Sequence, residues 1–269
     1  MDTSGSRRRS LLIVGAVGVV VVAVVLGGVF WFLRDDAPQS VSLEGATAGL
    51  PASSSTTAPP TGQAGQVSTT AAATASSAPA GVPAGVAGTW SVDTGVGKFD
   101  FENSTGSFVG FRVKEQLQGI GDVTAVGRTP KVSGTLRIDG TKVSVVEVTA
   151  DMTALVTNDS RRDGKARGAL DTARFPTARF VLTAPVDLGP DAAAGKAVTV
   201  EAQGELTVKG VTRPVRVPLQ AKLQGDTVVV VGSVEIVFAD YGVQVPSAPI
   251  VLSVQDHGAL ELQLFFRRS

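Results

Sequence analysis

The sequence contains no cysteine and a single histidine, His257. The missing thiols exclude disulfides, thiol catalysis, iron-sulfur clusters, cysteine-ligated zinc and a lipid attached through an N-terminal cysteine. One histidine excludes a multi-histidine metal site. Net charge is also absent, with 24 basic and 24 acidic residues, so nucleic acid is not an expected partner. With so few of the usual catalytic side chains, the composition favours binding a molecule over transforming it.

What the sequence does have is an uncharged run of 23 residues from Leu11 to Leu33. As a helix this run would be about 35 Å long, which spans the hydrocarbon core of a membrane. Lipid offers backbone groups no hydrogen-bond partners, so the run would be helical there despite its many valines. Three arginines at 7–9 precede it, whereas Arg34 is nearly cancelled by the two aspartates that follow. The positive-inside rule then places residues 1–10 in the cytoplasm.

A cleaved secretory signal is the alternative interpretation of this run. The apolar region of such a signal is usually about 7 to 15 residues long and ends at a small-x-small cleavage site. The run at 11–33 is longer, and the nearest Ala-x-Ala, at 46–48, lies well downstream. We therefore expect a single-pass anchor in the cell membrane, with the C-terminal part of the chain outside the cytoplasm.

Residues 34–87 are rich in Ala, Ser, Thr, Pro and Gly. From Ala37 onward they carry one charge, Glu44, and almost no large apolar side chain follows Leu50. Burial could not offset the entropy of ordering such a segment, so it is predicted to be a disordered linker. Its typical end-to-end span would be about 40 Å.

From residue 88 to the C-terminus at 269 the pattern changes to alternation of apolar and polar residues, which is typical of half-buried strands. The turn dipeptides Asp139-Gly140, Lys209-Gly210 and Gly225-Asp226, and the tripeptide at 256–258, separate these strands. About eight antiparallel strands follow, forming either a sandwich or a barrel. Pro218 should leave its strand bulged or partly unpaired. The clearest alternating stretches are 98–102, 109–113, 215–223 and 260–266.

The interval 157–179 interrupts the alternation. It mixes capping residues, charges and helix formers, and it ends near Pro176, so we expect a long excursion with a short helix. Six of its residues are basic and three are acidic, whereas the remainder of the folded part is slightly acidic. Positive charge is therefore concentrated in this excursion.

Four stretches of this sequence resemble the YceI-like, polyisoprenoid-binding family. The most specific is Gly-Glu-Leu-Thr-Val-Lys-Gly-Val-Thr-Arg-Pro-Val at 204–215. The others are Trp-Ser-Val-Asp at 90–93, Thr157-Asn158 leading to Arg162-Asp163, and Arg-Phe-Pro-Thr-Ala-Arg-Phe at 174–180. Together they extend the resemblance over roughly residues 89–266.

This resemblance implies an antiparallel barrel of lipocalin type around an elongated apolar cavity. Family members hold a long isoprenoid or other lipid chain there, so the expected partner is an apolar lipid, with no cofactor beyond a bound isoprenoid or fatty lipid and no enzymatic reaction. The sequence departs from the family pattern at Lys165 and Ala166, where a histidine and a leucine are common. It also has Phe238 where an arginine is usual before Asp-aromatic-Gly.

Apolar residues on the predicted strands are candidates for lining such a cavity, and each of them could equally belong to a filled core. They are Phe99, Phe101, Phe111, Val113, Phe180, Leu206, Val208, Val217, Leu219 and Phe238.

Candidate contacts to a polar headgroup lie in the excursion. A guanidinium fork at Arg162 could hold a phosphate or a quinone oxygen, assisted by Asn158 and Arg167. For Asp163 an ion pair that fixes the excursion to the sheet is the favoured interpretation. Two other functions remain open: an enzyme acting on a bound lipid with Asp163 or Asp240 as base, and a cell-envelope interaction module with a filled barrel.

Overall fold

The computed structural model describes residues 37–50, 85–245, 249 and 251–269. The predicted anchor at 11–33 and the cytoplasmic segment at 1–10 lie outside these residues. Within the described ranges, no helix has the length and apolarity needed to cross a membrane.

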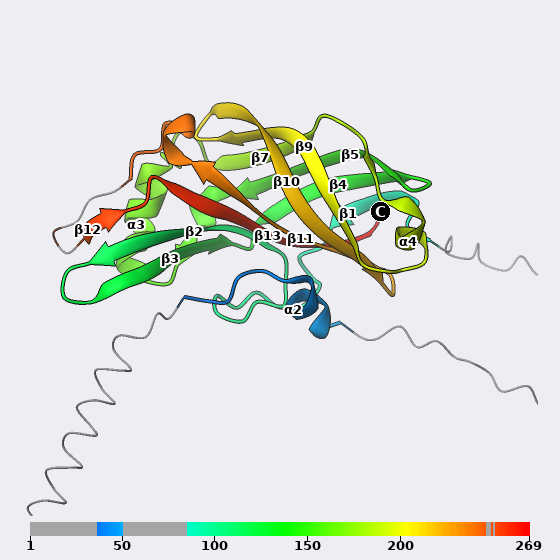
Figure 1. Ribbon diagram of the computed structural model, residues 1–269, viewed down its shortest axis with the longest axis horizontal. Helices are drawn as coiled ribbons and strands as arrows, with labels where there is room; N and C mark the ends of the chain where they lie inside the picture. Colours follow the sequence, from blue (N-terminus) through cyan, green and yellow to red (C-terminus); the bar gives the residue numbers. More distant parts are fainter. Residues whose placement is uncertain (1–36, 51–84, 246–248, 250) are drawn as a thin grey trace, which may run out of the picture.

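Eight antiparallel strands close into a barrel, which confirms the predicted all-β fold and decides against an open sandwich. Each strand pairs with its neighbour around the barrel, and the last pairs with the first (Figure 1). Around the barrel the strands are β1 (Gly88–Val92), β4 (Val132–Asp139), β5 (Lys142–Asp151), β7 (Thr177–Leu182), β9 (Val198–Val208), β10 (Val211–Gln224), β11 (Thr227–Val237) and β13 (His257–Arg268).

Strand β13 has two different neighbours on one of its edges. Residues 259–263 pair with β2 (Phe108–Leu117), and residues 266–268 pair with β1. Strands β3 (Gly121–Thr129) and β6 (Val156–Thr157) continue the sheet from β2. The wall is therefore built from different strands at the two ends of the barrel. The remaining elements are β8 (Val186–Asp187), β12 (Val251–Val254), α2 (Leu43–Ala48), α3 (Ser160–Ala169), α4 (Gly189–Ala193) and the 3-10 turns η1 (Met152–Ala154) and η2 (Phe238–Tyr241).

Three predicted hairpin turns are confirmed, at Asp139-Gly140, Lys209-Gly210 and Gly225-Asp226. Their glycines have φ of 63°, 75° and 63°, conformations that favour glycine. The fourth turn is displaced, because His257 already belongs to β13. The ladder between β10 and β11 begins only at Leu219, so Pro218 stands where that pairing stops, as its missing N–H requires.

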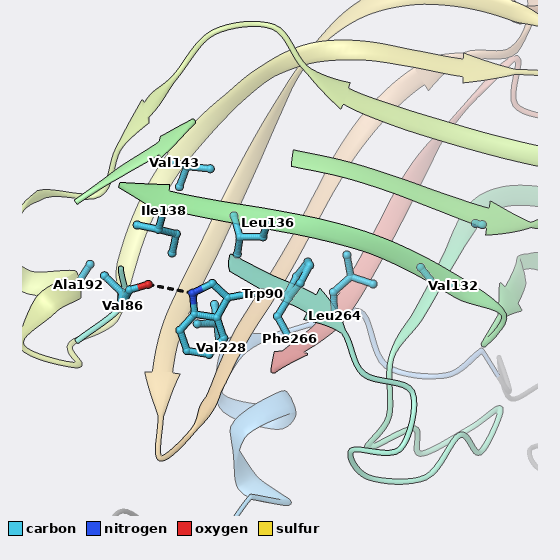
Figure 2. Packing of buried hydrophobic residues seen from close by; sticks show 11 residues of the cluster. Val86, Trp90, Val132, Leu136, Ile138, Val143, Ala192, Val228, Leu264 and Phe266 are labelled. Atoms are coloured by element: carbon cyan, nitrogen blue, oxygen red, sulfur yellow. Dashed lines mark hydrogen bonds between the residues drawn. The ribbon is translucent and has the colours of Figure 1, made fainter. Parts of the chain in front are cut away.

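A tryptophan closes the barrel at the end where β1 meets β13. Figure 2 shows Trp90 among inward side chains, with its indole N–H donating to the carbonyl of Val86 at 2.9 Å. The side chain is 1% exposed, and the Arg268 guanidinium carbon lies 4.5 Å from the ring centroid. Apolar residues pack around the ring and close this end of the barrel. They are Leu136, Ile138, Val143, Val228, Leu264 and Phe266.

The prediction of a strand at 98–102 is wrong. These residues form an irregular loop between β1 and β2, outside the barrel. The Phe99 ring meets Phe108 edge-on at 6.4 Å, and the Arg128 guanidinium lies 5.8 Å from the Phe101 ring. The alternation of apolar and charged residues arises here because the loop lays its aromatic rings on the outer wall.

Part of the predicted disordered linker is ordered: residues 37–50 lie along the outside of the barrel and are called the strap below (Figure 1). The strap contains α2, whose N-cap Ser42 accepts a hydrogen bond from the Gly45 amide at 3.1 Å. Ala46 is 1% exposed and packs against Val229 and Phe265. The average composition of the linker did not indicate that these few apolar residues would pack against a complementary surface on the barrel wall.

Replacing Trp90 with alanine should destabilise the fold by about 3–5 kcal/mol, because it opens a cavity in the closed end. Denaturant unfolding followed by circular dichroism measures this. The matched control Val145→Ala removes a side chain that is 47% exposed and should change stability by about 0.5 kcal/mol or less. Equal midpoints for the two variants would contradict the assignment of the closed end.

Candidate ligand-binding cavity

The barrel interior is hollow and contains two adjacent cavities. The inner cavity, next to the closed end, has a volume of about 140 Å³, and the outer cavity has about 660 Å³. The two share Val109, Ala178 and Leu260 in their walls. A barrel of eight strands can leave a slot of this kind when its inward side chains are short. Val and Ala are frequent inward residues of this barrel, so its interior is not filled.

Eight of the ten apolar residues predicted to line a cavity do so. Phe180, Leu206, Val217 and Leu219 line the inner cavity. The outer cavity is lined by the other four, namely Phe111, Val113, Val208 and Phe238. Phe99 and Phe101 do not line either cavity, since their loop lies outside the wall.

Glycines on neighbouring strands make room for two of these rings. A Cβ on Gly127 would lie 2.3 Å from Cε1 of Phe111, and a Cβ on Gly204 would lie 2.4 Å from Cζ of Phe180. Both rings therefore lie flat over a backbone instead of projecting into the hollow. The free volume of the barrel depends on these two contacts.

The outer cavity has a roof that the sequence patterns did not predict. The segment after η2 contributes Val243 and Val245, and β12 contributes Val251 and Val254. Tyr241 is 2% exposed, and burial raises the pKa of its hydroxyl, so the ring remains neutral and belongs to the apolar wall. None of these residues lies in a long alternating stretch, so no periodicity identified them.

An ion pair stands at the wall of the outer cavity, where α3 meets β2. Arg162 donates to Glu115 at 2.9 Å and to the side-chain oxygen of Asn158 at 3.0 Å. The side chains of Glu115 and Arg162 are 11% and 22% exposed. Asn158 also bridges to β3, accepting from the Val126 amide and donating to the Thr124 carbonyl, both at 3.2 Å. This end of the barrel is called the mouth below.

Two of the four predicted polar contacts line the cavity and two do not. Arg162 and Asn158 line it, together with Glu115, which was not predicted. Asp163 instead accepts from the backbone N–H and the hydroxyl of Thr157, at 2.8 and 2.7 Å. Arg167 donates to the Leu155 carbonyl at 2.8 Å. Asp163 thus fixes the excursion as favoured, although through hydrogen bonds to Thr157 and not through an ion pair. Arg167 lines neither cavity, because its guanidinium anchors the chain before α3, and its contact with a headgroup stays a prediction.

Comparison with known proteins agrees with this architecture. The model of the YceI-like domain matches residues 99–266. The chain belongs to the YceI-like family. A UPF0312 protein of Shewanella denitrificans is 30% identical over 153 residues, which cover 53% of this chain and 76% of that protein. Protein YceI of Escherichia coli is 35% identical over 126 residues, covering 45% of this chain and 59% of that protein.

Solved structures of similar proteins include BcnA of Burkholderia cenocepacia, with 22% identity and a TM-score of 0.46 over 59% of this chain and 95% of BcnA. A polyisoprenoid binding domain from Saccharophagus degradans, implicated in plant cell wall breakdown, has 18% identity and a TM-score of 0.49. That comparison covers 67% of this chain and 98% of the domain.

Two stretches that resemble the YceI-like family pack against each other. The turn between β9 and β10 has Lys209 at φ 50° and Gly210 at φ 75°. A Cβ on Gly210 would lie 2.5 Å from Cε1 of Phe175, so the turn fits under that ring. These stretches therefore serve folding, as expected for the hairpin.

Asp163→Ala should lower the free energy of unfolding by about 1–3 kcal/mol, because the buried Thr157 donors lose their acceptor. The matched control is Arg161→Ala on the same helix, whose side chain is 86% exposed and pairs with Asp159. It should cost about 0.5 kcal/mol or less. Chemical denaturation of both variants checks this, and an Asp163→Ala variant as stable as the control would refute the anchoring role.

Gly127→Ala should push the Phe111 ring into the outer cavity and reduce uptake of an apolar fluorescent probe, with an overpacking cost of about 1–3 kcal/mol. Gly168→Ala is the control, since a Cβ there meets no atom within 4 Å. Probe titrations of the two variants give the comparison. Unchanged uptake in Gly127→Ala would mean that the probe does not enter the outer cavity.

Proposed function

We propose that the chain is a membrane-tethered, extracytoplasmic protein that holds a long apolar lipid of isoprenoid type in the barrel. The observation that carries this proposal is the apolar hollow of about 660 Å³ next to an inner cavity of about 140 Å³. The outer volume lies within the range of roughly 300–1,000 Å³ typical of small-molecule sites. Membership of the YceI-like family supports it as well.

The shape of the hollow suits a slender chain that enters tail first. The inner cavity is walled by aliphatic and aromatic residues, with Arg179 the charged residue among them, whereas the polar side chains gather at the mouth. Each five-carbon unit moved from water into such a space contributes roughly 2.5 kcal/mol. Affinity therefore grows with chain length until the chain reaches the closed end at Trp90.

At the mouth, Arg162 and Asn158 would contact the polar end of the lipid. Arg162 already shares its charge with Glu115 at 2.9 Å, so the pair offers a hydrogen-bond donor without a large net charge. A quinone or hydroxyl oxygen fits this pair. Lys165, which also lines the outer cavity, would add attraction for a phosphate, whereas the charge of Arg161 is paired with Asp159 at 2.9 Å.

Binding without turnover is the function we infer. Neither Asp163 nor Asp240, the two bases considered for an enzyme, lines either cavity. The carboxylate of Asp163 accepts hydrogen bonds from the backbone N–H and the hydroxyl of Thr157. A pure interaction module would have a filled barrel. The free volume between the mouth and the closed end disfavours that alternative.

Photo-crosslinking of the full chain in membranes tests this function. A polyprenyl alcohol carrying a diazirine at its tail should label residues of the two cavities, identified by mass spectrometry of peptides. Ala178→Trp, which places a large ring where the cavities meet, should abolish that labelling. The control Ala193→Trp adds the same ring at an exposed position of α4 and should leave labelling unchanged. Equal labelling of both variants, or labelling confined to 11–33, would contradict binding in the barrel.

A further inference from the structure

The strap follows the barrel wall from a point near the mouth toward the closed end (Figure 1). At its start, Arg112 and Arg128 donate to the carbonyls of Pro38 and Gln39, the latter at 2.9 Å. At its end, Gln224 donates to the carbonyls of Thr47 and Leu50, both at 3.3 Å. The strap is thus attached at its start to β2 and β3 and at its end to β10.

The attachment near the mouth uses buried charge. Arg128 is 3% exposed, and its guanidinium carbon lies 4.5 Å from the Phe108 ring centroid. Arg112 pairs with Glu261, which is 2% exposed, at 2.7 Å. The strap carbonyls supply acceptors to these two guanidinium groups, and removing the strap would leave those donors without them. This arrangement favours a permanently docked strap.

Docking of the strap limits how far the barrel can stand from the predicted anchor. Ala37 follows Leu33 by four residues, which reach at most about 14 Å. Along β2, Arg112 is three residues, or about 10 Å, from Glu115 at the mouth. On β13, Ala259 pairs with Arg112 and lies nine residues, or about 30 Å, from Arg268 at the closed end. Of the two ends of the barrel, the mouth is therefore the one nearer to the end of the anchor.

The surface around the mouth matches a lipid headgroup region. Of the three large apolar side chains that are strongly exposed in the described residues, two are here: Leu252, 60% exposed, and Val237, 43% exposed. Leu252 belongs to β12, which pairs with the mouth end of β2. The basic side chains of α3 here are Lys165 and Arg161, which is 86% exposed and pairs with Asp159 at 2.9 Å. Apolar and basic side chains together favour insertion at an anionic interface.

We propose that the docked strap holds the barrel with its mouth against the membrane surface, so that lipid passes between bilayer and cavity without crossing water. This inference rests on the membrane tether proposed above. In this arrangement the barrel is held at a fixed orientation to the membrane instead of moving freely on a long flexible tether. The contacted partner is the anionic lipid surface of the membrane in which the chain is anchored.

The test uses the full chain in vesicles of phosphatidylcholine and phosphatidylglycerol that carry a nitroxide on a fraction of the headgroups. Because the chain has no cysteine, single fluorophores can be attached at Leu252→Cys and, as the matched far-end position, at Val145→Cys. We expect the nitroxide to quench the label at 252 several-fold more strongly than the label at 145. Equal quenching at the two positions would overturn the proposed orientation.

Ala46→Asp should undock the strap by burying a charge against Phe265 and should bring quenching at 252 down to the level at 145. Ala48→Asp makes the same change on the exposed side of α2 and should leave quenching intact. If Ala46→Asp fails to fold, Gln224→Ala removes two strap contacts from the barrel side and should also lower the quenching at 252. Undiminished quenching at 252 in a folded undocking variant would overturn the role of the strap.

Flotation of the vesicles separates the two proposals. A chain that does not float with the vesicles refutes the tether and the orientation together. A chain that floats but shows equal quenching at 252 and 145 refutes the orientation and leaves the tether standing.

Discussion

The split pairing of β13 is the constraint on which the rest of the structure depends. One half of its edge pairs with β1 and the other half with β2. Where β1 pairs, Trp90 and its apolar neighbours close the barrel beside the inner cavity, and where β2 pairs, the wall continues through β3 and β6 and encloses the outer cavity. The same division gives the barrel a closed end and a mouth. An apolar hollow closed at one end and polar at the other follows from it, and this is the geometry that a lipid with a long tail and a polar head requires.

Short inward side chains and flat aromatic rings keep this hollow open. Phe111 and Phe180 would occupy much of the interior if they projected into it, but Gly127 and Gly204 let them lie against the wall. Polar groups are likewise satisfied locally: Asp163 by Thr157, Arg167 by a carbonyl, and Arg162 by Glu115. The wall thus directs few of its polar contacts at the cavity itself, which leaves the apolar chain of a ligand as the main source of binding energy.

The periodicity of the sequence predicted most of the barrel, because strands with one face inward repeat every two residues. Eight of ten apolar candidates were placed correctly for that reason, including all four on β9 and β10. Phe99 and Phe101 were misplaced because a loop packed on the outer wall can produce the same alternation. Glu115 was missed since its relevance depends on an ion pair with α3, 47 residues away in sequence. The roof and the strap were missed because their burial depends on surfaces formed by distant strands, which composition and period do not encode.

Native mass spectrometry of the full chain, released from the membranes in which it was made, tests the hollow barrel most directly. We expect an added mass that corresponds to one apolar lipid per chain, and this mass should be lost when the cavities are filled by Ala178→Trp. A chain that carries no added mass, and that takes up no prenyl lipid when one is supplied, would contradict a hollow barrel that holds a lipid.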